Sequence, residues 1–477
     1  MNLSFYYKLP VALQNLLTTI QGLRFRRIRY TKHTWETFNF LNKSQFWSKE
    51  KHEDYQVDKL RHLVEYASKY SPYYAKLYSN LKIGYKQIKE PADIRILPII
   101  SKEEFRKNNN AIISTNIPRK AMWAAYTAGT TGTPMVAYFP HIMMQERFAF
   151  LERLYQWYNP KPWRRRASFT GRLIVKPDNP KNIFHRNNRA LNQQLFSSHH
   201  LIEKYLKYYV KELIKFVPEQ VDGIASSIYS VAEFMVRNGL ANDVKPKVVI
   251  PTSDTVWPHI RDRIEKAFQC KLANQYSSQE GAPFAYECPE RGFHICPESG
   301  IFEILRPDNS PCGYAEPGRL VVTSFQSQGT PLIRYDIGDI AAWRDGECKC
   351  GRKMPMVENI EGRTEDIFYT NERGVIPKVD SAFKSLPNCI KATQVAQVGK
   401  NRFEVRIVPD KETYKSFYAD TLINNLHDYL GRSVDIDLKI VSEIKRTSGG
   451  KLRAQVNECM DEQMLNAIAE SWNRQQI

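Results

Sequence analysis

The spacing of apolar residues changes along the chain. Over residues 1–90, apolar and aromatic side chains recur every three or four positions, most regularly at 60–78, which predicts a helical N-terminal region. Further on, short apolar runs alternate with helical patterns such as the one at 141–158. This alternation predicts an α/β architecture in which helices flank β-sheets. Ser101 and Glu104 have the spacing of a capping box, so we expect a helix to begin after this serine.

The C-terminal part follows a different pattern. Residues 300–345 read as β-rich, and strand-like runs at 402–409 and 434–441 then enclose a helical pattern at 412–430. We therefore predict a large domain followed by a small α+β domain, with the boundary near Gly362. The predicted parts are a helical N-terminal region of the large domain at 1–90, its main body at 91–361, and the small domain at 362–477.

Composition and charge narrow the class of protein. Hydrophobic residues make up 42% of the 477 positions and charged residues 25%, which is typical of a folded globular chain. The formal charge of +18 would attract anions such as nucleotides, nucleic acid, phospholipid headgroups or acidic saccharides. The basic clusters at 24–29 and 164–166 lie beside no nucleic-acid-binding motif, so we expect no nucleic-acid partner. A generally basic surface is the simpler interpretation.

The first thirty residues bear on localisation. They lack the early basic region, the clean apolar run and the cleavage site of a secretory signal. No run approaches 18 consecutive apolar residues, so no membrane span is expected. Residues 11–28 fit a helix docked on the domain, or a basic amphipathic helix lying on an anionic membrane. We expect a cytoplasmic protein, with peripheral contact at the inner face of the membrane as the alternative.

Several of the eight cysteines are clustered, which in a chain without an export signal favours a metal site over disulfides. Cys288 and His294 form a C-x5-H pair, and Cys348 and Cys350 form a C-x-C pair. Three thiolates and one imidazole would make a closed tetrahedral site for structural Zn²⁺. Cys296 is a rival ligand, and ordinary buried thiols are the alternative.

The segment at 126–134, Y-T-A-G-T-T-G-T-P, combines glycines with hydroxyl side chains. Glycines allow backbone N–H groups to face an anion, and the hydroxyls add further donors. The segment lacks the Gly-Lys-Ser/Thr ending of a P-loop. A plain hairpin turn is the alternative to a phosphate-binding loop.

Two later segments carry acidic residues next to predicted strands. Asp339, at a predicted strand end, could accept hydrogen bonds from ribose hydroxyls. Tyr276 could flank a base, and Glu280 could hold Mg²⁺ among phosphates. Arg334 and Asp336 have a simpler interpretation as a surface ion pair.

The order of the motifs is more specific than any one of them. T-A-G-T-T-G-T-P, Y-S-S-Q-E, R-Y-D-I-G-D, G-R-T-E-D and T-S-G-G-K-L-R follow one another from 127 to 453. In this order they resemble the adenylate-forming superfamily of acyl-CoA synthetases, luciferases and peptide-synthetase adenylation domains. The segments F-S-S-H-H-L at 196–201 and C-x-C-G-R at 348–352 are similar to the phenylacetate–CoA ligase family. The chain looks closest to its branch associated with capsular and other surface polysaccharides.

The resemblance implies ATP and Mg²⁺ as cofactors and assigns the nucleotide site by matching positions. The residues expected to hold the β- and γ-phosphates are Thr127, Gly129, Thr130, Thr131 and Gly132. Those expected around adenine and ribose are Thr252, Ser253, Asp254, Tyr276, Ser277, Asp339 and Arg363.

The resemblance also implies the catalytic residues. Lys451 would bridge the substrate carboxylate and the α-phosphate, Glu280 would ligate Mg²⁺, and Thr131 would contact the phosphates. Glu365 falls at the hinge about which the small domain turns. Because two anions meet when a carboxylate attacks the α-phosphorus, a cation and a lysine fit the chemistry. A lysine on a glycine turn would arrive only when the small domain closes.

The resemblance implies activation of a small-molecule carboxylic acid as acyl-AMP with release of pyrophosphate, then acyl transfer in surface-polysaccharide synthesis. Residues 366–383 are more polar than the segment that helps form the pantetheine path in CoA ligases of the family. An amine on a sugar nucleotide or lipid-linked saccharide is therefore as plausible an acceptor as CoA. The alternatives are an aryl- or acyl-CoA ligase and a non-catalytic paralogue that scaffolds polysaccharide assembly. Phe169, Phe196 and 197–200 are candidates for the acyl pocket, with core or loop roles as the alternative.

Overall fold

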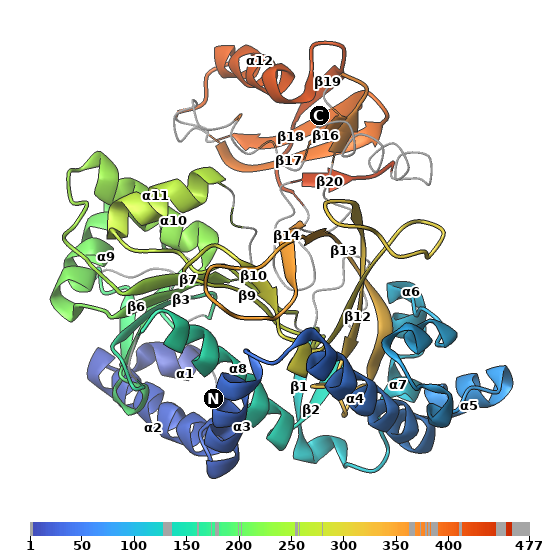
Figure 1. Ribbon diagram of the computed structural model, residues 1–477. Coiled ribbons are helices and arrows are strands. Elements are labelled where there is room, and N and C mark those ends of the chain that lie inside the picture. Colours follow the sequence, from blue (N-terminus) through green and yellow to red (C-terminus); the bar gives the residue numbers. More distant parts are fainter. Residues whose placement is uncertain are drawn as a thin grey trace.

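The structure is a computed structural model. It describes residues 3–126, 136–159, 162–172, 174–176, 181–198, 200–201, 203–252, 256, 258–278, 280–361, 368–372, 374–376, 379, 382, 390–409, 413–444 and 455–459. Helices flank several sheets within this part of the chain, as Figure 1 shows. The predicted α/β architecture is confirmed.

The N-terminal region is helical, as its periodicity predicts. Its helices are α1 (Leu3–Lys8), α2 (Val11–Arg29), α3 (Lys32–Ser44), α4 (Lys49–Tyr70) and α5 (Pro72–Leu81). The short helices α6 (Lys102–Lys107) and α7 (Asn109–Ile112) follow this region. The Ser101 hydroxyl accepts a hydrogen bond of 3.1 Å from the Glu104 N–H, which confirms the predicted start of α6. Helix α2 is docked on strand β4 (His185–Asn188), where Gly22 lets the helix lie directly against Asn188. The docked arrangement predicted for this helix is thus present.

A five-stranded sheet has the order β4-β5-β3-β6-β7. Its other strands are β5 (Gln193–Ser197), β3 (Arg166–Thr170), β6 (Gln220–Ile224) and β7 (Val248–Thr252), all parallel to one another, and β4 is antiparallel to β5. Helices α9 (Glu203–Phe216), α10 (Ala225–Arg237) and α11 (Pro258–Phe268) share a hydrophobic core with this sheet. Phe169 and Phe196 stack on each other inside that core, with ring centroids 5.3 Å apart. They are core residues here, as the simpler interpretation expected.

A second, antiparallel sheet of seven strands has the order β11-β12-β13-β14-β10-β9-β8. The strands are β8 (Gln275–Tyr276), β9 (Ala285–Glu287), β10 (Phe293–Ile295), β11 (Gly300–Leu305), β12 (Pro317–Ser324), β13 (Leu332–Arg344) and β14 (Met356–Glu361). Helices α4 and α5 pack into the same core as this sheet. The predicted β-rich region coincides with β11, β12 and β13.

The seven-stranded sheet curls until its two edges meet. Tyr276 lies on edge strand β8 and Phe302 lies on the opposite edge strand β11, yet their ring centroids are 6.0 Å apart. Neighbouring strands are spaced by about 4.8 Å, so a flat sheet of this order would separate its edges by several times that distance. The sheet is therefore rolled into a barrel-like shape, with Tyr276 at its seam.

A buried ion pair connects helix α8 (His141–Trp157) to the segment between β10 and β11. Arg153 and Glu298 lie 2.8 Å apart with side chains that are 0% and 1% exposed. The Ser44 hydroxyl, at the end of α3, donates a further hydrogen bond to Glu298. Burial is the largest single effect on the pKa of Glu298 and raises it, but the Arg153 charge and the hydrogen bonds from Arg153 and Ser44 together lower it by more, so the net shift is downward.

The C-terminal elements have their own core. They comprise β15 (Phe368–Thr370), β16 (Gly374–Ile376), β17 (Ile390–Gly399), β18 (Arg402–Pro409), α12 (Phe417–Leu430), β19 (Asp435–Ile440) and β20 (Gln455–Asn457). Figure 1 shows them gathered at one end of the molecule. Leu422, Leu426 and Leu430 of α12 pack with Phe403 and Val405 of β18. The helix begins five residues after the predicted start at 412.

Candidate nucleotide site and metal cluster

Asp339 lies inside strand β13, at a bulge. The pairing with β12 shifts register between Arg319 and Val321, opposite the segment that contains Gly338. Gly338 has a φ of +80°, which the absence of a side chain permits. The prediction of a strand end at Asp339 was wrong because β13 continues beyond the bulge to Arg344. Bulges of this kind re-aim a side chain, here the carboxylate of Asp339.

The nearby ion pair was predicted with the wrong partners. Arg334 is 4% exposed and lies 2.8 Å from Glu303. Asp336 lies 2.7 Å from Arg319. Glu303 lies on β11, two strands away from β13, and Arg319 lies on the neighbouring strand β12. Arg334 and Asp336 do not form a surface pair with each other.

Tyr276 and Asp339 lie together although 63 positions separate them in the sequence. The Tyr276 hydroxyl donates a hydrogen bond of 2.6 Å to Oδ2 of Asp339. Burial, followed by the negative charge of Asp339, raises the pKa of Tyr276 well above its ordinary value. The phenol therefore stays protonated and acts as a donor. Two residues assigned to adenine and ribose are thus brought into direct contact.

A tight turn follows Tyr276 and carries the predicted magnesium ligand. The N–H of Gly281 donates to the carbonyl of Ser278 (3.2 Å), and the N–H of Ala282 donates to the Ser278 hydroxyl (3.1 Å). Gly281 has a φ of +100°, and a Cβ there would lie 2.7 Å from the ring of Phe139. Only glycine fits this position without displacing the ring. Glu280, which is 8% exposed, lies on this turn, four positions after Tyr276 in the sequence.

Arg147 of α8 reaches the same turn. Its Nη2 donates a hydrogen bond of 2.8 Å to the Ser277 hydroxyl, and its guanidinium lies 4.4 Å from the ring centroid of Phe284 and 5.6 Å from that of Phe139. Burial lowers the pKa of Arg147 to about 10, so it remains charged at neutral pH. Sequence reasoning missed this residue because it lies in an ordinary helical pattern outside every motif.

Most of the remaining predicted residues fall outside the described part of the chain. Those are Thr127, Gly129, Thr130, Thr131, Gly132, Ser253, Asp254, Arg363, Glu365 and Lys451. The hairpin that precedes α8 is described on both sides of the Thr/Gly-rich segment, as β1 (Met122–Tyr126) and β2 (Val136–Pro140), and Tyr126 pairs with Val136. The exposed Thr252 ends strand β7.

Four predicted metal ligands form one cluster. The ligand atoms of Cys288, His294, Cys348 and Cys350 all lie within 4.8 Å of one another. Cys288 and Cys348 have sulfur atoms 3.5 Å apart, and the Cys350 sulfur lies 3.3 Å from Nε2 of His294. The set offers three thiolates and one imidazole, the donors of a closed structural zinc site.

The surroundings of the cluster fit a bound ion. Nδ1 of His294 lies 3.3 Å from the carbonyl oxygen of Met354, a contact that orients the ring and leaves Nε2 towards the sulfurs. A Cβ at position 292 would come within 2.8 Å of both the Cys348 sulfur and His294, so Gly292 leaves the cluster open at its centre. Cys296 is not a member of the cluster; it is buried beside Arg153, and burial raises the pKa of its thiol to about 12.

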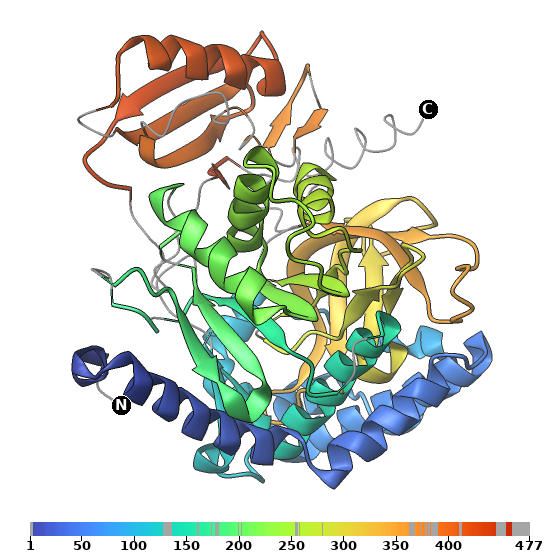
Figure 2. The ribbon, with the colours of Figure 1, turned by 90° about the vertical axis from the view of Figure 1, so that its left-hand side faces the viewer.

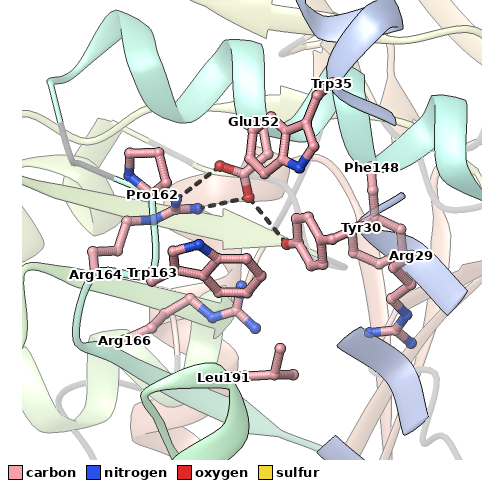
Figure 3. Close-up of a pocket in the computed structure, with 10 residues that line it drawn as sticks. All are labelled: Arg29, Tyr30, Trp35, Phe148, Glu152, Pro162, Trp163, Arg164, Arg166 and Leu191. Atoms are coloured by element: carbon pink, nitrogen blue, oxygen red, sulfur yellow. Dashed lines mark hydrogen bonds and ion pairs between the residues drawn. The ribbon is translucent and has the colours of Figure 1, made fainter. Parts of the chain in front are cut away.

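A separate small pocket lies at the end of α2 (Figure 3). Glu152 accepts hydrogen bonds there from the Tyr30 hydroxyl (3.0 Å) and from Arg164 (2.9 Å). The Arg166 charge is met by Asp222 at 3.2 Å. The pocket has a volume of about 20 Å³, room for roughly one water molecule. It is a polar junction between α2, α3, α8 and β3, and none of the predicted site residues lines it.

Among the described residues, no helix combines the length and apolar character that crossing a bilayer requires. Helix α2 contains residues 11–28, the segment for which an amphipathic helix was one interpretation of the sequence. Its exposed face carries a row of apolar side chains. Leu13, Leu16, Ile20 and Leu23 are between 44% and 52% exposed and follow one another at three- and four-residue spacing. They therefore form one apolar stripe on the side of α2 that faces away from β4.

The chain is similar in sequence and in fold to several known proteins. Residues 368–458 match a family model described as the CapK C-terminal domain. The chain is 30% identical over 455 residues to Protein CapK of Staphylococcus aureus, covering 95% of this chain and 98% of that protein. It is 22% identical over 434 residues to phenylacetate-coenzyme A ligase of Thermus thermophilus, covering 83% and 94%. The solved structure of 2-hydroxyisobutyryl-CoA ligase in its postadenylation state matches with a TM-score of 0.65 at 16% identity, covering 90% of this chain and 94% of that one.

Proposed function

This chain belongs to the CapK branch of the phenylacetate–CoA ligase family, within the adenylate-forming ligases, and we propose that it activates a carboxylic acid with ATP. In the proposed reaction a carboxylate oxygen forms a bond to the α-phosphorus of ATP while the bond to pyrophosphate breaks. The product is an acyl-adenylate, whose acyl group then passes to an acceptor. Family membership agrees with the order of the five sequence motifs.

The observation that carries this proposal is the contact between Tyr276 and Asp339. The two residues come from different strands of a rolled sheet and present a partly buried aromatic ring beside a carboxylate. A ring can stack on adenine, and an adjacent carboxylate can accept bonds from ribose hydroxyls. Glu280, on the turn after Tyr276, is proposed to hold Mg²⁺, which would neutralise phosphate charge when bound.

The remaining roles are part of the same proposal. The segment at 127–134 would hold the β- and γ-phosphates, with Ser253, Asp254 and Arg363 around the nucleoside. Lys451 would stabilise the charge that develops as the carboxylate meets the α-phosphate. We assign it to a small domain at 362–477 that turns about Glu365, because the C-terminal elements have a core of their own.

The Cys/His cluster is proposed to hold structural Zn²⁺. Cys288 and His294 flank the turn from β9 to β10, whereas Cys348 and Cys350 lie between β13 and β14. An ion there would join two hairpins of the rolled sheet. Its proposed role is stability, since four protein ligands leave no open position for a substrate.

The acceptor and the biological setting are part of the same proposal. Similarity to CapK supports a role in capsule or other surface-polysaccharide synthesis. For that role we propose an amino-sugar nucleotide or a lipid-linked saccharide as acceptor. Similarity to phenylacetate-coenzyme A ligase supports CoA as the alternative acceptor. The acyl-adenylate step is common to both.

The apolar stripe on α2 supports a peripheral position at the inner, anionic face of a membrane. Figure 2 shows the N-terminal helices along one edge of the molecule. Arg24, Arg26 and Arg27 are exposed at the C-terminal end of α2, next to Leu23. Exposed apolar side chains flanked by arginines match a surface of acyl chains beneath anionic headgroups. A cytoplasmic protein docked in this way would lie close to lipid-linked acceptors.

The test is acid-dependent exchange of labelled pyrophosphate into ATP, screened over aryl acids, fatty acids and amino acids. Wild type should catalyse exchange with at least one class, and Lys451→Ala should abolish it while ATP binding persists. A matched control is Lys439→Ala, since Lys439 is an exposed lysine of β19 that pairs with Glu404. Exchange near the wild-type rate in Lys451→Ala would sink the assignment of that lysine. The best acid would then be offered CoA and amino-sugar nucleotides in turn.

A further inference from the structure

Arg147 has a charge that no acidic side chain of the described residues balances. Its Nη1 atom is buried and makes no hydrogen bond among them, and its one polar contact there is with the neutral Ser277 hydroxyl. The other arginines buried near α8 differ in this respect. Arg153 pairs with Glu298, and Arg164 pairs with Glu152.

A buried donor without a partner is costly, so its presence beside a candidate site has to be explained. The cost is greater still when the unmet group is charged. The rings of Phe139 and Phe284 offset part of this through cation–π contacts. These contacts leave the Nη1 hydrogens unpaired. Such a group fits a cation held ready for an anion that arrives with the substrate.

Arg147 lies beside the proposed nucleotide residues, and its contacts run towards an aromatic cluster. It contacts Ser277, one position from Tyr276, and its guanidinium lies over the ring of Phe284. The hydroxyl of Tyr286, whose ring stacks on Phe284 at 5.4 Å, is likewise buried without a hydrogen bond among the described residues. Two donors without partners among the described residues therefore lie around the same aromatic ring.

The chemistry of acid activation indicates which anionic group would pair with Arg147. The reacting carboxylate loses its negative charge when it becomes a mixed anhydride with AMP. A permanent cation bound to that carboxylate alone, without the α-phosphate that Lys451 is proposed to bridge, would stabilise the ground state more than the product, which opposes the reaction. A cation fixed on a helix is better matched to a group that keeps its charge throughout.

Resting on the proposed function, we infer that the acid activated by this protein carries a second anionic group, a carboxylate or a phosphate, which Arg147 binds. The Arg147 guanidinium would form a charge-assisted, two-pronged contact with that group through Nη1 and Nη2. The substrate class is therefore a dicarboxylic or phosphorylated acid. Simple fatty or aryl monocarboxylates are disfavoured because they would leave the guanidinium unpaired.

The test compares pyrophosphate exchange for acids matched in carbon skeleton. The pairs are valerate with glutarate, benzoate with isophthalate, and glycerate with 3-phosphoglycerate. In wild type, the member with the second charge should have a kcat/KM at least about tenfold higher in one or more pairs, as expected for a charge-assisted contact. The first two pairs report a carboxylate, and the third reports a phosphate.

Three variants separate recognition from folding. Arg147→Met keeps an unbranched apolar stem but removes the guanidinium, and it should abolish the preference by lowering kcat/KM for the dianionic acid alone. Arg147→Lys keeps the charge and should retain part of the preference. Arg119→Met is the matched control, because Arg119 also lies over an aromatic ring, that of Tyr138, but is exposed. It should behave as wild type.

The outcomes that overturn the inference differ from those that overturn the proposed function. Wild-type preference for the monoanionic acids, or an equal loss for both members of every pair in Arg147→Met, would overturn the inference and leave acid activation standing. A rise in the KM for ATP with unchanged acid preference would assign Arg147 to the nucleotide and also overturn it. Absence of exchange with every acid would overturn the proposed function and the inference together.

Discussion

The hydroxyl of Tyr276 lies 2.6 Å from the carboxylate of Asp339, although three strands separate β8 from β13 in the hydrogen-bonding order of their sheet. The contact exists because the sheet is rolled. Curvature therefore brings together two groups that the sequence only suggests are related. The first prediction uses this hydrogen bond.

Tyr276→Phe removes the hydroxyl and keeps the ring. We expect the KM for ATP in pyrophosphate exchange to rise about three- to tenfold, the usual value of one net hydrogen bond, because Asp339 loses a donor that orients it. Asp339→Ala should raise it further, since the carboxylate itself is proposed to bind ribose. Equal melting temperatures for wild type and Tyr276→Phe would show that the effect is local. An unchanged KM in both variants would remove these residues from the nucleotide site.

Removing one partner of the buried ion pair should cost more stability than removing both. Arg153→Met leaves Glu298 buried and unpaired, and we expect a loss of about 3–5 kcal/mol in the free energy of unfolding. The double variant Arg153→Met/Glu298→Leu should recover a large part of that loss, because no charge is left unmatched. Denaturant titration of the four proteins of this double-mutant cycle measures the coupling. Additive losses would contradict a strong interaction between the two side chains.

The same pair should make stability depend on pH in acid. The pKa of Glu298 in the folded protein is lowered, so its contribution is fully present above the ordinary glutamate pKa of about 4.5 and is lost as pH falls through the folded value. Glu298→Gln lacks this titration. Free energies of unfolding measured from pH 7 down to pH 3 should therefore fall more steeply for wild type than for Glu298→Gln. Parallel curves would show that this carboxyl does not contribute.

Purified protein should contain about one zinc ion per chain, because the four clustered ligands make one closed site. Cys348→Ser should lose the metal and lower the melting temperature, and a strong chelator should have the same effect on wild type. Cys270→Ser is the control, since Cys270 lies outside the cluster. Elemental analysis checks the stoichiometry. Equal zinc contents in the two variants would place the ion elsewhere.

The apolar stripe on α2 predicts binding to anionic vesicles. Leu16→Glu/Ile20→Glu should reduce co-sedimentation with phosphatidylglycerol-containing vesicles at least about tenfold, because burying each apolar side chain contributes roughly 1.5–3 kcal/mol. Leu81→Glu is the control, as Leu81 is 51% exposed on α5 and lies outside the stripe. Vesicles of phosphatidylcholine alone should bind wild type weakly. Equal binding of all three proteins would refute a membrane-facing role for α2.

Local patterns predicted much of this fold because they act within a few residues. The strand at 402–409, the helix after Ser101 and the C-x5-H and C-x-C pairs are all encoded by short spacings. The predicted grouping of Tyr276 with Asp339 came from motif order, not from geometry. The barrel-like curl that joins them depends on twist summed over seven strands, which no short pattern carries.

Long-range pairing explains what the sequence did not predict. Arg334 and Asp336 are close in sequence and of opposite charge, yet each pairs across to another strand, with Glu303 and Arg319 respectively. Arg147 belongs to no motif and is distinguished by having no acidic partner among the described residues. Such a feature depends on the three-dimensional surroundings of a residue, which no short sequence pattern specifies.

The seam at Tyr276 makes the nucleotide site sensitive to events far from it. Tyr276 contacts Phe302 on the other edge strand and Asp339 in the middle of the sheet. Its position therefore depends on the twist and curvature of all the strands between them. A one-residue insertion in β10 or β14 would alter that shape without touching a nucleotide-binding residue. Weak ATP binding in a natural variant of this chain could then arise from a length change in a remote hairpin, and alignments that score the motifs alone would overlook its cause.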